Sequence, residues 1–236
     1  MKLLISLLGS LAVLGSAQAS VISYDFTATI KLINAYGPHM HVPTHPSSGT
    51  LAGTTYSLGD LVHGHIDYDT ETGLSDSQNN PPASGTSLFY QSPGAHNVLA
   101  ATANGGQLMP APGPSDETIL QIENDVITVS GRDLFALLQY SRHGDEKQVS
   151  TLAFFDPTRT MLNGAGIPDS LHLGPTILAS VDTGYIFADG SVLYIAAELT
   201  SLTVSAPVPE PSSYLLLLAG LAMILFKCRS RLLAKL

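Results

Sequence analysis

Two histidines in the first third of the chain have the spacing of a metal-binding pair. His63 and His65 stand one residue apart within the alternating stretch LVHGHIDYD at 61–69. Residues i and i+2 of a strand face the same side, so both imidazoles would be able to bind one Zn²⁺ or Cu²⁺ ion. A Pro-rich loop before them carries three more histidines, His39, His41 and His45. Because His-x-His pairs without a further fixed ligand are common, surface histidines are the favoured interpretation and a metal site is the alternative.

Acidic side chains follow the histidines and suggest a second kind of site. Ca²⁺ prefers several carboxylate and carbonyl oxygens, and the candidate ligands are Asp67, Asp69, Glu71 and Asp76. The run differs from an EF-hand loop, because Gly73 falls at the seventh position and Gln78 stands where the bidentate glutamate belongs. A solvated acidic turn is therefore the favoured interpretation, and a calcium site is the alternative.

Motifs of the common enzyme classes are missing. The sequence has no G-x-S-x-G elbow, no H-E-x-x-H, no G-x-x-x-x-G-K and no G-x-G-x-x-G. The adjacent acids Asp116-Glu117 and Asp145-Glu146 lie in loop-like segments, where such pairs usually serve solubility. A glycosidase needs two carboxylates at a set separation, which a linear pattern neither shows nor excludes. We expect no enzymatic activity and no cofactor, and a secreted hydrolase is the least favoured alternative.

The charge balance argues against nucleic acid as a partner. The 236 residues contain 10 Lys and Arg against 19 Asp and Glu, which gives a net charge of -9. Phosphate binding requires clustered cations, whereas those between Ser20 and Val208 are scattered: Lys31, Arg132, Arg142, Lys147 and Arg159. The single cysteine, Cys228, excludes an intramolecular disulfide.

The first 19 residues have the pattern of a secretory signal peptide. Lys2 precedes an apolar run from Leu3 to Leu14, and small residues follow, with Ala17 and Ala19 in the A-x-A positions. We therefore expect a signal helix at 1–19, export through the Sec translocon and cleavage by signal peptidase after Ala19. A retained anchor is the alternative, but the apolar run is shorter than the roughly 20 residues that span a bilayer.

Residues 206–236 have the pattern of a C-terminal membrane anchor. VPEP at 208–211 precedes an uncharged stretch at 212–226, and a basic tail follows at 227–236. The stretch predicts a transmembrane helix of about 22 Å, with its basic tail in the cytoplasm. A buried core helix is the alternative. Prolines fix φ and lack an amide donor, so the VPEP segment should be extended and suited to the groove of a protease or transpeptidase.

The tripeptide, the apolar span and the basic tail together resemble the PEP-CTERM sorting signal of Gram-negative, biofilm-forming bacteria. That resemblance implies that a membrane exosortase recognises Pro209, Glu210 and Pro211. The protein would be anchored transiently in the inner membrane and then released or moved to the cell surface. The same tail is sometimes labelled an ice-binding protein C-terminal domain. Segments 48–70 and 155–171 also resemble other exported proteins of this kind, which implies a β-sandwich without an assigned activity.

The middle of the chain, 20–205, has the alternation of an all-β domain. Short runs with period two are bounded by turn residues, and they cover 21–33, 61–69, 118–130, 150–156 and 191–205. Asp189-Gly190 predicts a hairpin with a primed turn, whereas 131–141 fits a helix or a strand. The Gly/Pro-rich segments Asn79–Ser84 and Ala103–Ser115 are expected to be loops. Eight to eleven strands at this spacing predict an antiparallel β-sandwich or jelly roll.

The expected function is that of a non-enzymatic cell-surface or extracellular matrix protein. Its association with exopolysaccharide and biofilm is implied by the resemblance of the tail. A calcium-dependent or carbohydrate-binding module is the alternative.

Overall fold

Antiparallel strands make up most of the described chain. The computed structural model describes residues 21–38, 42–72, 74–78, 86–93, 97–126, 132–162 and 166–205. The expected signal helix at 1–19, with Ala17 and Ala19, lies outside the described residues. So does the expected sorting signal at 206–236, with its transmembrane helix at 212–226. None of the described residues belongs to a helix long and apolar enough to cross a membrane.

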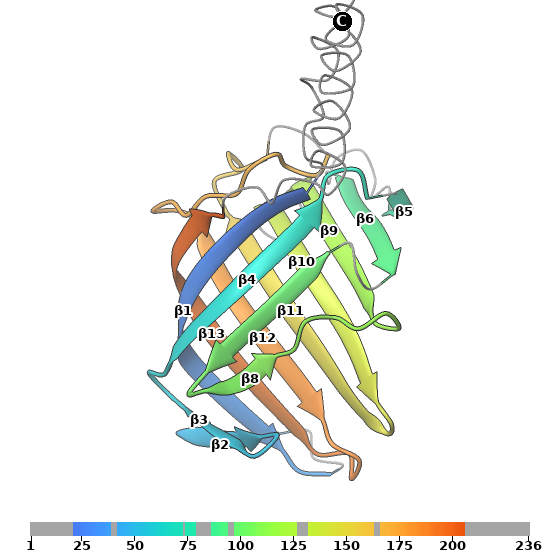
Figure 1. Ribbon diagram of the computed structural model, residues 1–236. Helices are drawn as coiled ribbons and strands as arrows, with labels where there is room; N and C mark the ends of the chain where they lie inside the picture. The colour runs from blue at the N-terminus through green and yellow to red at the C-terminus, as the bar shows by residue number, and fades with distance from the viewer. Residues whose placement is uncertain are drawn as a thin grey trace, which may run out of the picture. The chain divides into compact units, whose positions relative to one another are not determined.

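Thirteen strands run through the described residues. They are β1 (Val21–Tyr36), β2 (Ser48–Leu51), β3 (Thr54–Ser57), β4 (Leu61–Asp69), β5 (Leu74–Gln78), β6 (Thr86–Pro93), β7 (Val98–Ala103), β8 (Gly106–Met109), β9 (Glu117–Val126), β10 (Arg132–His143), β11 (Glu146–Asp156), β12 (Leu178–Ile186) and β13 (Val192–Val204). Eleven of them form one sheet in the order β5-β6-β9-β10-β11-β12-β13-β1-β4-β7-β8, and β2 pairs with β3 (Figure 1). The predicted all-β, antiparallel class is confirmed.

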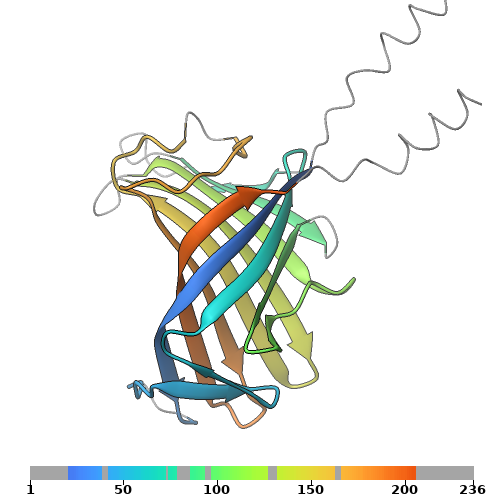
Figure 2. The same ribbon diagram turned by 60° about the vertical axis from the view of Figure 1, so that its left-hand side comes forward.

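The large sheet curls so that two parts of its inner face oppose each other (Figures 1 and 2). Aromatic rings connect these parts across the core. The rings of Tyr68 on β4 and Phe135 on β10 are 5.2 Å apart. Tyr24 stacks on Tyr68 at 6.4 Å, and Phe154 meets Phe135 edge-on at 6.2 Å. The facing layers of the fold are therefore provided by a single hydrogen-bonded sheet.

The strand pattern of the sequence matches the burial of the side chains. On β4, Val62, Ile66 and Tyr68 are fully buried, while His63, His65 and Asp67 face outward. Residues 131–141, which fitted either a helix or a strand, lie mostly in β10. This strand pairs with β9 on one side and β11 on the other. Pairing on both edges favours the strand over the local helical spacing.

The expected loop Ala103–Ser115 contains strand β8, so this prediction is wrong for 106–109. Asn104 and Gly105 have φ of 52° and 76°, as in a type I′ turn, and they join β7 to β8. Two buried glutamines bind β8 and Pro110, the residue that follows it. Gln148 Nε2 donates to the Leu108 carbonyl at 2.9 Å, and Gln139 Nε2 donates to the Pro110 carbonyl at 2.7 Å. Strand β8 is thus secured from the opposite layer.

The hairpin predicted at Asp189-Gly190 connects β12 and β13, but its turn is not of a primed type. Of the connecting residues only Gly190 has a positive φ, 83°. The Gly190 amide donates to the Phe187 carbonyl at 2.9 Å, so Ala188 and Asp189 are the central residues of the turn. A turn of this kind followed by a left-handed glycine is the common three-residue alternative to the primed hairpin.

The segment between β11 and β12 covers one end of the core (Figure 2). Its side chains Leu162 and Leu171 are buried in the hydrophobic cluster. The Leu162 amide donates to Asp133 Oδ2 at 2.9 Å, and the Leu171 amide donates to Tyr24 Oη at 2.6 Å. The described residues of the segment are therefore tied to both layers.

Candidate functional site

The outer face of β4 carries most of the predicted site residues. His63, His65 and Asp67 alternate with the buried side chains of this strand. The prediction that the two histidines share a face is confirmed. Asp69 ends the strand on the same face, and Glu71 follows in the turn.

Gly64 lies between the histidines because the ring of Phe26 occupies the space of a side chain. Gly64 is paired with Phe26 on the neighbouring β1. A Cβ on Gly64 would lie 2.1 Å from Phe26 Cζ and 2.6 Å from both Cε atoms. A glycine in a strand often marks such a close approach. The His-Gly-His spacing therefore has a packing reason in the core as well as an outward-facing pair.

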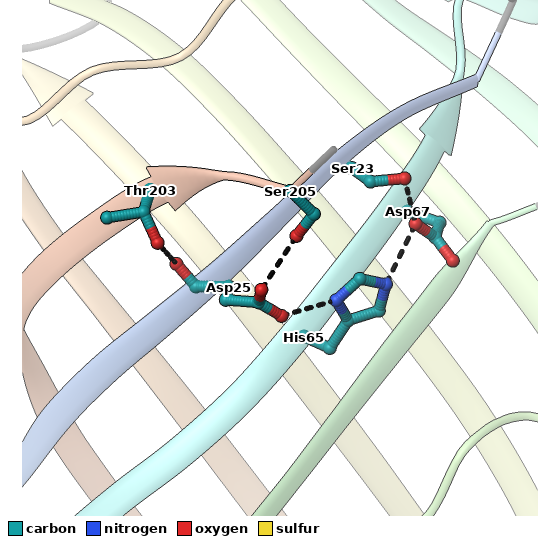
Figure 3. A network of polar contacts seen from close by, with 6 residues as sticks. All are labelled: Ser23, Asp25, His65, Asp67, Thr203 and Ser205. Atoms are coloured by element: carbon teal, nitrogen blue, oxygen red, sulfur yellow. Dashed lines mark hydrogen bonds and ion pairs between the residues drawn. The ribbon is translucent and has the colours of Figure 1, made fainter. Parts of the chain in front are cut away.

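His65 is held between two carboxylates from adjacent strands (Figure 3). Its Nδ1 lies 2.8 Å from Asp25 Oδ1, and its Nε2 lies 2.9 Å from Asp67 Oδ1. The Ser23 hydroxyl donates to Asp67 Oδ1 at 2.5 Å. The Ser205 hydroxyl donates to Asp25 Oδ2 at 2.9 Å. The network thus joins β1, β4 and the residue that follows β13.

Both ring nitrogens of His65 face carboxylate oxygens, an arrangement that favours the protonated ring. Ionised carboxylates only accept hydrogen bonds, and a neutral imidazole has a single N–H. Partial burial on its own lowers the pKa of His65, but the hydrogen bond that His65 donates to Asp25 and the charge of Asp67 outweigh it and raise this pKa. The hydrogen bond that Asp25 accepts from His65, followed by the one from Ser205, lowers the pKa of Asp25. When His65 is protonated, the cluster contains two ion pairs, one with Asp25 and one with Asp67.

Asp67 and Asp69 stabilise local structure. Asp67 Oδ1 is occupied by His65 and Ser23. Asp69 Oδ1 accepts the Glu71 amide at 2.9 Å, which closes the turn after β4. Within the described residues, no group of three or more His, Cys, Asp or Glu side chains has an arrangement that would hold a metal ion. The side chain of Asp76 lies outside the described residues.

The histidine-rich loop contributes no described ligand to this face. His45 Nδ1 lies 2.6 Å from Asn34 Oδ1. Asn34 is nine residues along β1 from Asp25, a separation of about 30 Å in an extended strand. His39 and His41 lie outside the described residues. The structure therefore does not bring His45 to the His63–His65 pair.

Sequence reasoning missed Asp25, Ser23 and Ser205. The alternation of 21–33 placed Asp25 on the face opposite Tyr24 and Phe26, and this was the only available signal. Its meeting with His65 depends on the register of β1 against β4, where these two residues are direct partners. The sequence pattern carries no information on that register.

A groove of about 810 Å³ crosses the outer face of β11, β12 and β13. The segment from Leu173 to Ile177 forms one wall, and the floor contains small side chains of Ala153, Ser180 and Ala196. Lys31 and Glu198 add one charge of each sign, and Lys31 stands at a bulge of β1. At the β11 end, the Arg132 guanidinium lies 5.2 Å from the centre of the Phe155 ring. The volume is in the range of ligand sites.

Comparison with known proteins identifies the C-terminal segment. Residues 207–231 match the family model of the PEP-CTERM protein-sorting motif. No curated protein and no solved structure matches the chain. The match covers the predicted Pro209, Glu210 and Pro211, whose structure is outside the described residues. The chain is therefore an exported protein with an exosortase sorting signal, anchored transiently in a membrane and then exposed at the surface.

Proposed function

We propose that this chain is a non-enzymatic cell-surface or matrix protein of a Gram-negative bacterium, associated with the exopolysaccharide of a biofilm. The Sec translocon exports it, and signal peptidase cleaves after Ala19. Exosortase then recognises Pro209-Glu210-Pro211 and removes the anchor. The observation that carries this proposal is the sorting motif at 207–231, which begins two residues after the β-domain ends at Ser205.

The contacts of the polar cluster support a non-enzymatic role. A serine nucleophile needs a base to take its proton. Ser23 and Ser205 donate to Asp67 and Asp25, and His65 uses both nitrogens on the same two carboxylates. Neither serine is hydrogen-bonded to His65, whose two nitrogens both lie against carboxylates. The cluster is suited to joining strands.

The groove supports extracellular polysaccharide as the partner. Sugar rings combine an apolar face with hydroxyl groups. The Phe155 ring and the adjoining alanine floor suit the apolar face, and Lys31 and Glu198 suit hydroxyl groups or a uronate carboxylate. These features favour the carbohydrate-binding alternative over a calcium-dependent one, because Asp67 is bound within the sheet and Asp69 within the turn.

The sorting step is tested by replacing Pro209-Glu210-Pro211 with three alanines in the cell that makes the protein. The variant should accumulate at full length in the membrane fraction, while the natural protein is shortened and reaches the surface. Mass spectrometry of the shortened protein should find Ser20 as the first residue. Unchanged processing of the alanine variant, or of the natural protein in cells without exosortase, would refute the assignment.

Polysaccharide binding is tested by affinity electrophoresis of the purified protein in gels that contain exopolysaccharide of the same cell. The polymer should retard the natural protein, and replacement of Lys31 and Glu198 by alanine should weaken the retardation. Alanine at Lys147 and Glu71, which keeps the same net charge, is the control. Equal mobility with and without polymer would remove the groove from the proposal.

A further inference from the structure

The end of the folded domain is fastened by a group of polar side chains that we name the junction clasp: Ser23, Asp25, His65, Asp67 and Ser205. The Ser205 amide donates to the Ser23 carbonyl at 2.9 Å, and its hydroxyl donates to Asp25 Oδ2. The Thr203 hydroxyl also donates to the Asp25 carbonyl at 3.3 Å. Figure 3 shows Asp25 at the centre, between β13 and β4.

Hydrophobic burial contributes little at this end of β13. Leu199 is its last fully buried side chain, Leu202 is partly buried against the core, and Val204 is 70% exposed. The final residues are held by the backbone ladder to β1, in which Thr203 pairs with Asp25, and by the clasp. Beyond Leu202, backbone pairing and polar contacts therefore hold the end of β13 in the sheet.

The clasp lies very close to the sorting signal along the chain. Only residues 206–208 separate Ser205 from Pro209. Four residue steps reach at most about 14 Å, even when the chain is fully extended. A small domain is about 30 Å across. An enzyme that binds Pro209 therefore acts within about 14 Å of Ser205, the last residue of the folded domain.

We propose that the junction clasp is a positioning device for exosortase processing, which sets how much free chain precedes the tripeptide. With the clasp closed, the tether begins at Ser205. With the clasp open, residues 202–205 leave the sheet and add roughly 14 Å of reach. Asp25 is the central positioning residue, because it binds both His65 and Ser205. This inference rests on the proposed cleavage at the tripeptide.

The clasp is tested with Asp25→Ala and Ser205→Ala in the full chain, expressed in the cell that carries the exosortase. Loss of a hydrogen bond should raise the frayed population, and with it the processing rate in a pulse-chase experiment, on the order of 3- to 10-fold. Asp189→Ala is the matched control, because Asp189 is also exposed and accepts from a serine hydroxyl, that of Ser191 at 2.6 Å, in the turn at the other end of β13. It should leave the rate unchanged.

Two further measurements separate positioning from general destabilisation. Hydrogen exchange of the purified full chain should accelerate at 202–205 in the Asp25 and Ser205 variants, while exchange in β10 stays protected. A flexible insertion after Ser205 should raise the processing rate of the natural protein. The same insertion should raise the processing rate of the Asp25→Ala variant only slightly. Ser205→Ala keeps the test valid if Asp25→Ala fails to fold.

The outcomes distinguish this inference from the proposed function. Continued processing after alanine replacement of the tripeptide would overturn both. Processing that depends on the tripeptide, but has the same rate in clasp variants with faster exchange at 202–205, would overturn the clasp alone. An insertion without effect on the rate would overturn it as well.

Discussion

Replacement of Gly64 by alanine tests how the His-Gly-His stretch is built into the core. The new methyl group would meet the Phe26 ring, whose Cζ lies 2.1 Å from the ideal Cβ position. Carbon atoms at van der Waals contact are about 3.5–4.0 Å apart, so the ring must retreat by more than about 1 Å. Phe26 is only 2% exposed and has little room to do so. Overpacking of this kind lowers the free energy of unfolding by about 1–3 kcal/mol. Alanine offsets roughly 0.5–1 kcal/mol of this, because its unfolded backbone has less conformational entropy to lose than that of glycine.

The free energy of unfolding of Gly64→Ala should therefore be about 1–2 kcal/mol lower than that of the natural protein. Urea unfolding measures it, followed by tyrosine fluorescence because the chain has no tryptophan. The same change in a Phe26→Leu background should cost much less, with a coupling energy above about 1 kcal/mol. Gly166→Ala is the control, since no atom lies within 4 Å of its added Cβ. A neutral or stabilising Gly64→Ala, or an equal cost in both backgrounds, would refute the packing explanation.

Three other predictions concern polar groups. Burial alone raises the pKa of Asp156, but hydrogen bonds from Thr158 and Thr160 outweigh it and lower this pKa to about 2. The stabilising contribution of Asp156 is therefore present above pH 3.8 and lost as the pH falls through about 2. Over that pH range the free energy of unfolding should fall less in Asp156→Asn than in the natural protein, as measured by acid unfolding. Gln148→Leu removes the side-chain amide that donates to the Leu108 carbonyl. The free energy of unfolding should fall by about 1–3 kcal/mol, and hydrogen exchange in β8 should accelerate. Millimolar Ca²⁺ should leave the thermal midpoint unchanged, because Asp67 and Asp69 already serve the sheet and the turn; a midpoint that rises with calcium and falls back with chelator would reject this.

How much of this structure the sequence predicts depends on how far apart in the sequence the interacting residues lie. Alternation along β4 is local, so the shared face of His63 and His65 was predictable. The pairing of His65 with Asp25 spans 40 residues, and only the register of β1 against β4 creates it. Strand β8 lies between these cases. Its Asn-Gly turn is a local hairpin signal, but the surrounding glycines and prolines favoured a loop, and Gln148 from the opposite layer supplies the missing stabilisation.

The chain secures its strand ends with polar side chains, and its cysteine content explains why. Exported domains often lock loops and edges with disulfides, but the only cysteine is Cys228, within the sorting motif. Hydrogen bonds take this role at three places: Gln148 holds β8, Asp133 holds the segment after β11, and Asp25 holds the end of β13. The first two are buried, where an unmade hydrogen bond is costly, so they fasten the fold permanently. The third is exposed to water, where opening costs little, and along the sequence it directly precedes the sorting motif at 207–231.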